Sequence, residues 1–216
     1  SIIIAYIVVI IFVYFYQRNL LYHPSENNYQ NDTIQFNHQE IFIKVNDEIK
    51  LKSWIINKDL KNFKTLVFFH GNAGDLSNRI YKLNELDKLN INILLISWRG
   101  FSGNEGYPTE KNLYEDAESA LKWVENNTQV KKSNLIIYGE SLGTGVAVEL
   151  GTRYLFKSIV LEAPFTSITD IAQKKYKIFP VKFNLSDPPK KILIFPKSNG
   201  TEDIIESFKN KKSNII

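Results

Sequence analysis

Apolar positions divide the chain into one uninterrupted N-terminal run and a later series of short, spaced segments. Residues 2–16 carry no charged side chain, and Gln17 and Arg18 end this run. Farther along, apolar segments of strand length alternate with longer segments in which apolar residues recur at helical spacing. This alternation predicts an α/β fold, with a mostly parallel sheet covered by helices on both faces.

The predicted sheet begins with a hairpin and continues with four buried strands. Ile41–Val45 and Ile49–Ile56 flank Asn46-Asp47, which is typical of an antiparallel pair joined by a tight turn. The later strands are short and apolar: Leu66–Phe69, Ile91–Ile96, Leu135–Tyr138 and Ser158–Leu161. The predicted helices are Leu76–Leu89, Glu110–Asn126 and Gly143–Tyr154. One face of the second helix carries Leu113, Ala117, Ala120, Leu121 and Val124.

The N-terminal run predicts a membrane anchor. As a helix, residues 2–16 would be about 22 Å long against a hydrocarbon core of about 30 Å, so we expect residues before Ser1 to complete the span. Aromatic residues at 14–16, followed by Arg18, are typical of a membrane interface. The alternatives are a buried core element and a cleaved signal peptide, but no basic start and no small-residue cleavage site accompany the run.

The chain is therefore divided into a single-pass anchor over 1–18, a polar tether over 19–38 and one domain over 39–216. Residues 2–16 would contact the lipid bilayer, and one arginine does not fix the side of the membrane. A length of 216 residues with 44% hydrophobic content suits a single domain of this size.

Composition removes several classes of function. The chain has no cysteine, which excludes disulfides, thiolate metal sites and cysteine nucleophiles. The net charge is +4, and the lysines are scattered among acidic residues, so we expect no nucleic-acid partner. We also expect no metal site and no cofactor.

Residues 139–143 fit the pattern G-x-S-x-G, with Gly139 and Gly143 around Ser141. A predicted strand precedes this pattern and a predicted helix follows it, as in a nucleophile elbow that raises a serine hydroxyl above a sheet edge. The backbone N–H of Leu142 would then donate to an oxyanion. The alternative is a glycine-rich turn in which the serine caps the helix.

A second loop of small residues follows the strand Leu66–Phe69. It contains His70, Gly71, Asn72 and Gly74, and the N–H of Asn72 is the candidate for the second oxyanion donor. The alternative is an ordinary strand-to-helix loop. A third loop after Ile96 contains Arg99, for which we expect a structural ion pair or carbonyl contacts, and Thr109, the expected N-cap of the next helix.

These three motifs, with the N-terminal run and Leu20–Ser25 behind it, resemble the membrane-anchored α/β-hydrolase-domain family. That group includes the bud-emergence-type and serine-aminopeptidase-like hydrolases, and the similarity extends through residues 161–167. The resemblance implies an α/β-hydrolase fold, a nucleophile at Ser141, and an oxyanion hole formed by Asn72 and Leu142. It also implies that the substrate is a small acyl ester, thioester or amide, or a lipid.

The pattern breaks after Ser141. The family's catalytic acid and histidine follow the serine along the chain, whereas His23, His38 and His70 all precede it. We expect a shortened C-terminal part, incomplete after about residue 185, in which residues 197–203 stand where the histidine loop would be. His70 is a candidate substitute base, but a bond to its own loop is the favoured interpretation.

Three functions remain open on these grounds. The first is a membrane-anchored serine hydrolase acting through Ser141. The second is a catalytically inactive relative that binds a lipid or a partner protein. The third is an incomplete gene product without a function of its own.

Overall fold

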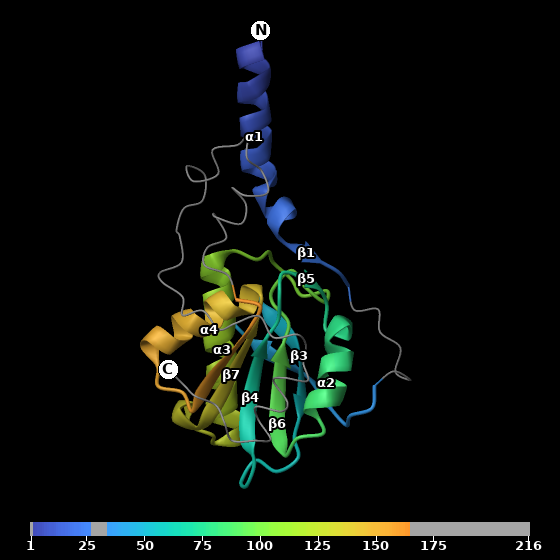
Figure 1. Ribbon diagram of the computed structural model, residues 1–216, viewed down its shortest axis with the longest axis vertical. Helices are drawn as coiled ribbons and strands as arrows, with labels where there is room; N and C mark the ends of the chain where they lie inside the picture. The colour runs from blue at the N-terminus through green and yellow to red at the C-terminus, as the bar shows by residue number, and fades with distance from the viewer. Residues whose placement is uncertain (1, 27–33, 165–216) are drawn as a thin grey trace.

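The computed structural model describes residues 2–26 and 34–164, whose main feature is a six-stranded sheet (Figure 1). The strand order is β2-β3-β6-β4-β7-β8. The strands are β2 (Gln39–Lys44), β3 (Lys50–Ile56), β4 (Lys64–Phe69), β6 (Ile91–Ile96), β7 (Leu135–Glu140) and β8 (Ser158–Glu162). All six predicted strands are therefore present, with ends that differ by a few residues.

The pairing directions follow the prediction. β2 and β3 form the expected antiparallel hairpin, and β3 pairs antiparallel with β6. β6, β4, β7 and β8 are parallel to one another. The carboxyl ends of β4 and β7 therefore meet at one edge, which is where ligands bind in open α/β sheets.

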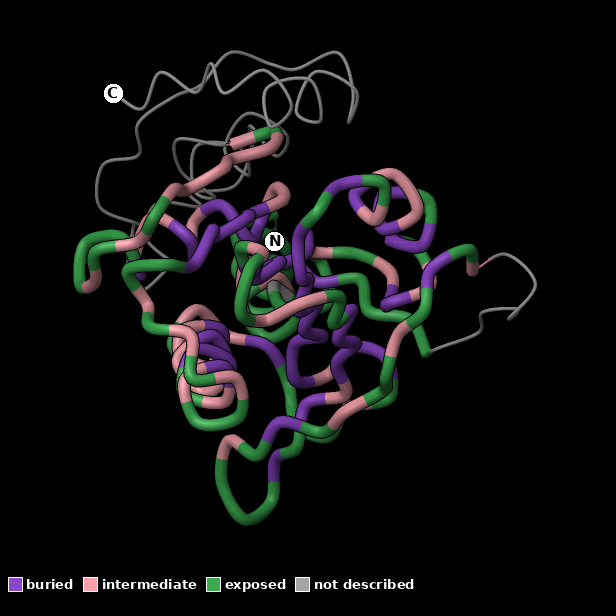
Figure 2. The backbone as a smooth tube through the Cα atoms, turned by 90° about the horizontal axis from the view of Figure 1, so that it is seen from below, coloured by how far each residue is buried: buried purple, intermediate pink, exposed green. Residues whose placement is uncertain are grey.

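Helices cover both faces of the sheet, and the strands between them are largely buried (Figure 2). Residues along each strand alternate between two cores. One core joins Val67, Leu94 and Ile137 to α3 (Glu110–Thr128) and α4 (Leu142–Arg153). The other joins Leu66, Ile93 and Ile136 to α2 (Ile80–Leu86). The five apolar residues predicted for the inner face of Glu110–Asn126 are all buried.

The segment predicted as Leu76–Leu89 forms less α-helix than expected. A 3-10 turn, η2 (Ser77–Arg79), precedes the seven residues of α2. Asp75 explains this start, because its carboxylate accepts hydrogen bonds from the backbone N–H groups of Ser77 and Asn78. Side-chain bonds of this kind favour a local turn over regular helix.

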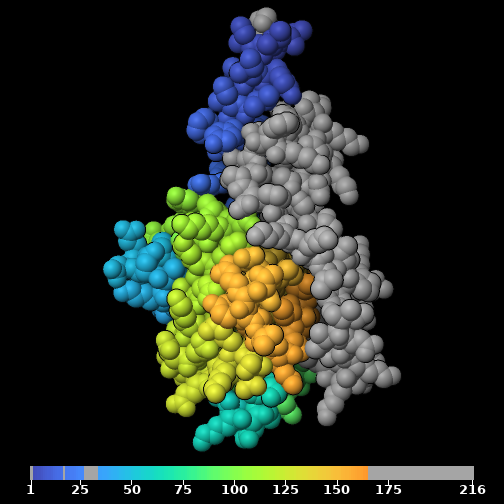
Figure 3. Space-filling view, turned by 90° about the vertical axis from the view of Figure 1, so that its left-hand side faces the viewer, coloured from blue at the N-terminus to red at the C-terminus, as the bar shows by residue number. Residues whose placement is uncertain are grey.

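The N-terminal helix α1 (Ile2–Leu21) projects from the body of the molecule (Figures 1 and 3). Many of its apolar side chains are exposed, including Ile2 at 89% and Phe15 at 75%. None of the helices in residues 2–26 and 34–164 is both long enough and apolar enough to cross a bilayer.

Part of the segment predicted as a tether is held against the domain. α1 continues to Leu21, and β1 (His23–Pro24) pairs in parallel with β5 (Ala73–Gly74). These contacts come from backbone hydrogen bonds, which a polar, turn-rich composition does not exclude. The expected shortened region after about residue 185 and the loop 197–203 lie outside the described residues.

Candidate active site

Ser141 occupies the turn between β7 and α4 in a strained backbone conformation. Its φ is +48° and its ψ is −111°, a combination that is costly for a residue with a Cβ atom. The surrounding bonds hold it there. The Ser141 N–H donates to the carbonyl oxygen of Glu162 at 2.9 Å, and its own carbonyl accepts from the N–H and the hydroxyl of Thr144 at 2.9 and 2.6 Å. This is the geometry expected of a nucleophile elbow.

Gly139 and Gly143 are required by close backbone contacts on both sides of the serine. A Cβ atom at Gly143 would lie 2.0 Å from the carbonyl oxygen of Phe69, and one at Gly139 would lie 2.5 Å from the carbonyl oxygen of Gly143. The first turn of α4 therefore packs directly on the end of β4. This contact brings the elbow next to the loop that follows β4.

The loop of residues 70–75 lies against the serine, as the sequence predicts. A Cβ atom at Gly71 would be 3.5 Å from the Cβ of Ser141, so the loop backbone lies close to the serine side chain. Gly74 supplies a φ of +81° where the chain turns toward η2.

The N–H groups of both predicted oxyanion donors are available. Within the described residues, the backbone N–H of Asn72 donates no hydrogen bond, while its side chain donates to the carbonyl oxygen of Leu21 at 2.7 Å. Leu142 is the first residue of α4, and N–H groups in a first helical turn lack an intrahelical acceptor. Asn72 and Leu142 thus offer two main-chain donors from the two segments that meet at Ser141.

His70 is a buried structural residue. Its side chain is fully buried, its Nδ1 lies 2.7 Å from the carbonyl oxygen of Gly71, and its Nε2 accepts from the N–H of Trp98 at 3.4 Å. Burial lowers its pKa well below the usual value, and the charge of Arg79 acts in the same direction. Both ring nitrogens are engaged, so the expected bond to its own loop is confirmed and His70 is a poor candidate for a general base.

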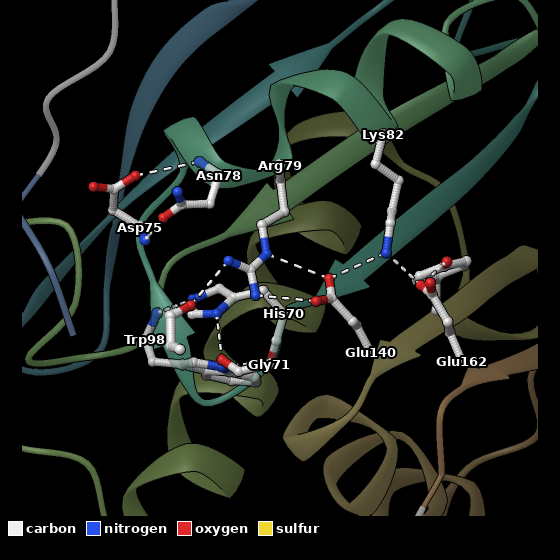
Figure 4. A network of polar contacts seen from close by, with 11 residues as sticks. His70, Gly71, Asp75, Asn78, Arg79, Lys82, Trp98, Glu140 and Glu162 are labelled. Atoms are coloured by element: carbon white, nitrogen blue, oxygen red, sulfur yellow. Dashed lines mark hydrogen bonds and ion pairs between the residues drawn. The ribbon is translucent and has the colours of Figure 1, made fainter. Parts of the chain in front are cut away.

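A charged network beside the elbow was not predicted from the sequence (Figure 4). Arg79 donates to both carboxylate oxygens of Glu140, at 3.3 and 3.1 Å, and Lys82 pairs with Glu140 and Glu162. Arg79 is 6% exposed and Lys82 only 1%. Charged residues in α2 look like an ordinary solvated helix face in sequence, and only the position of Glu140 beside Ser141 could have drawn attention to them.

The third predicted loop is structural, as expected. Arg99 donates through its backbone N–H and Nε to the fully buried carboxylate of Asp116, at 2.9 and 2.8 Å. Burial raises the pKa of Asp116, and the bonds from Arg99 oppose that shift. Thr109 caps α3 by accepting from the N–H of Asn112 at 3.1 Å.

The remaining histidines lie on other elements. His23 belongs to β1, and His38 packs against Trp54 with ring centroids 4.6 Å apart. Among the described residues no group of three or more histidine or carboxylate side chains could hold a metal ion. The candidate site therefore consists of a serine and two main-chain donors, and the charged network lies beside it.

Known proteins are similar to this chain in sequence. Residues 34–179 match the family described as alpha/beta hydrolase of unknown function (DUF1057). An uncharacterized protein of Mycobacterium tuberculosis is 30% identical, over 83% of this chain and 64% of its own length. Human alpha/beta hydrolase domain-containing protein 17B is 35% identical, over 67% of this chain and 51% of its own.

The solved structures agree on the fold. An esterase from Pyrococcus furiosus superposes with a TM-score of 0.60 at 21% identity, covering 75% of this chain and 66% of that one. This confirms the α/β-hydrolase fold predicted from the sequence. The chain spans about half to two thirds of the length of the two relatives described above. By its match over residues 34–179, the chain belongs to the α/β-hydrolase family described as being of unknown function.

Proposed function

We propose that this chain is a serine hydrolase that cleaves an acyl ester, thioester or small amide through Ser141. One observation carries the proposal, namely the strained serine between β7 and α4 with Gly71 packed against it. Keeping a residue at a positive φ costs of order 1–3 kcal/mol, and such strain is concentrated at functional sites.

The chemistry follows from the neighbouring groups. The Ser141 Oγ attacks the substrate carbonyl carbon, and its proton is transferred to a solvent water or hydroxide, because both ring nitrogens of His70 are engaged. The oxygen of the tetrahedral intermediate accepts hydrogen bonds from the N–H groups of Asn72 and Leu142. The alcohol, thiol or amine then leaves with a proton, and water hydrolyses the acyl–Ser141 ester to the free acid.

A reaction with a fluorophosphonate probe tests the nucleophile. The folded protein should be labelled at Ser141, and Ser141→Ala should abolish the label. Ser133→Ala removes an exposed serine just before β7, at the opposite end of that strand from the elbow, and should leave labelling at the wild-type rate. A folded, cooperatively melting protein that takes no label would refute a reactive Ser141.

One observation favours a second candidate, a hydrolase-like protein that binds acyl ligands without cleaving them. His70, the histidine of the loop beside Ser141, has both ring nitrogens engaged and is not free to act as the base. A serine hydrolase that lacks its base retains a rate enhancement of only about 10³–10⁴-fold over the uncatalysed reaction in water. This candidate would be supported if the wild type and Ser141→Ala bound a fluorescent long-chain fatty acid with equal affinity and the wild type took no fluorophosphonate label.

We also propose that residues 2–16 attach the protein to a lipid bilayer. The support is an apolar helix whose side chains are exposed, including Val8 at 57% and Ile11 at 51%. Flotation with phosphatidylcholine vesicles tests this. Val8→Arg with Ile11→Arg should prevent flotation, because each arginine places a charge on the apolar surface that would lie against the lipid.

The matched control for charge is Asn126→Arg with Asn127→Arg, at two exposed positions of α3. This variant should float like the wild type. Flotation of the Val8/Ile11 variant to the same extent as the wild type would contradict attachment through this helix.

A further inference from the structure

The loop of residues 70–75 is held from two sides, and the two sets of contacts differ in kind. On the N-terminal side, the N–H groups of His23 and Ser25 donate to the carbonyl oxygens of Asn72 and Gly74 at 2.9 and 3.0 Å. These bonds set the loop against α1 and β1. They do not fix its distance from Ser141, which belongs to a different part of the fold.

On the elbow side, the side chain of Arg79 connects the loop to the segment that carries Ser141. Arg79 donates through Nη1 to the carbonyl oxygen of Ala73 at 2.9 Å. Through Nε and Nη2 it donates to the two carboxylate oxygens of Glu140, the residue next to Ser141. A planar guanidinium that binds a carboxylate through two N–H groups has little freedom to rotate.

The packing around this bridge is tight. A Cβ atom at Gly71 would lie 3.3 Å from Nη2 of Arg79, 3.4 Å from Oε1 of Glu140 and 3.5 Å from the Cβ of Ser141. The backbone of Gly71 therefore lies within side-chain reach of the guanidinium, of its carboxylate partner and of the serine, and Figure 4 shows Gly71 beside Arg79 and Glu140. A change in the position of Arg79 would move the loop relative to Ser141.

We infer that Arg79 is a positioning residue that fixes the N–H of Asn72 relative to the N–H of Leu142 across Ser141. This assignment deepens the proposed hydrolase function and rests on it. Arg79 touches neither the substrate nor the reacting atoms. It acts through the Ala73 carbonyl on one side and through Glu140 on the other. A displacement of about 1 Å in such a site can reduce the rate about a hundredfold.

Lys82 provides a matched control. It lies one helical turn after Arg79, is equally buried and pairs with the same Glu140 carboxylate at 3.3 Å. Its other partner is Glu162, and within the described residues it bonds no atom of the loop. Arg79→Met and Lys82→Met each remove one buried cation from the network, but only the first removes the bond to Ala73.

The test compares these two variants and Arg79→Lys with the wild type, all as the full chain in detergent. Hydrolysis of p-nitrophenyl acetate gives kcat and KM, and fluorophosphonate labelling gives the reactivity of Ser141. Arg79→Met should lower kcat by about 10²-fold, close to the loss of one oxyanion donor, with KM little changed. Arg79→Lys should recover only part of this loss, because a lysine cannot hold both Glu140 and Ala73.

Lys82→Met should keep kcat within a few fold of the wild type once its thermal transition shows that it is folded. An independent readout is amide hydrogen exchange over residues 70–75, which should accelerate in Arg79→Met and stay at the wild-type rate in Lys82→Met. Equal losses of kcat in the two Met variants, or a change of KM alone, would overturn the assignment.

The exchange measurement separates the two proposals. If the wild type neither hydrolyses the ester nor takes the probe, the hydrolase function fails. The rate of amide hydrogen exchange over residues 70–75 then still shows whether Arg79 holds the loop against the elbow. Unchanged exchange in Arg79→Met would refute that role, whatever the activity of the chain.

Discussion

The burial of His70 predicts a specific dependence of stability on pH. Its folded-state pKa is held well below 6.5, mainly by desolvation, whereas in the unfolded chain it should titrate near 6.5. As the pH falls through 6.5, the unfolded state binds a proton that the folded state does not accept. The unfolded state is then favoured, so this contribution to stability is present above pH 6.5 and is lost as the pH falls.

The magnitude follows from the linkage relation. If His70 stays neutral in the fold down to pH 5.5, lowering the pH from 7.5 to 5.5 should reduce the free energy of unfolding by about 1.4 kcal/mol through this group alone. The assay is urea unfolding at several pH values in this window, extrapolated linearly to water.

Two variants isolate the contribution of this residue. His70→Asn keeps a side-chain N–H near the Gly71 carbonyl but removes the titrating ring, so the change between pH 7.5 and 5.5 should shrink by about 1.4 kcal/mol. His38→Asn leaves His70 in place and should keep its contribution. A pH dependence of His70→Asn equal to that of the wild type would refute a neutral, buried His70 and would reopen its candidacy as a base.

Three further predictions concern stability, each measured by urea or thermal unfolding. Gly143→Ala should lower the free energy of unfolding by about 3 kcal/mol or more, because its Cβ would lie 2.0 Å from a main-chain oxygen of β4. In Gly151→Ala the new Cβ meets only the movable end of one side chain, so the loss should be much smaller. Asp116→Ala should lower the free energy of unfolding by about 3 kcal/mol, because the buried guanidinium of Arg99 then keeps only the half-exposed Glu115 as an acidic partner. Glu115→Ala, at the exposed end of the same network, should lower it by about 0–1 kcal/mol. Thr109→Ala should cost about 1 kcal/mol through loss of the N-cap of α3. These reasons would be contradicted by equal losses of stability in the Gly143 and Gly151 variants or in the Asp116 and Glu115 variants. An unchanged stability of Thr109→Ala would also contradict them.

Most of the sheet could be predicted because its signals are local. Strands buried on both faces are short apolar runs, and α3 shows its inner face through the spacing of Leu113, Ala117 and Leu121. The elbow was recognisable because Gly139 and Gly143 are required by a turn whose flanking strand and helix are also visible in the sequence. The hairpin was recognisable from Asn46-Asp47.

The polar part of the site could not be predicted in the same way. The bonds between Arg79 and Glu140 span 61 residues, and those between Lys82 and Glu162 span 80. In the sequence these side chains are ordinary charges on a helix and at strand ends. Their burial depends on how α2 packs across β7 and β8, which no local pattern specifies.

The N-terminal segment shows the same division. The sequence determined an apolar run over residues 2–16 and a polar stretch after it, because hydropathy is a property of each residue. Only the tertiary structure decided that β1 pairs with β5 and that Asn72 donates to Leu21, since these bonds join segments about 50 residues apart. For Ser141, the sequence alone determined its place between a strand and a helix. The fold decided which groups surround it, because those groups come from four separate segments of the chain.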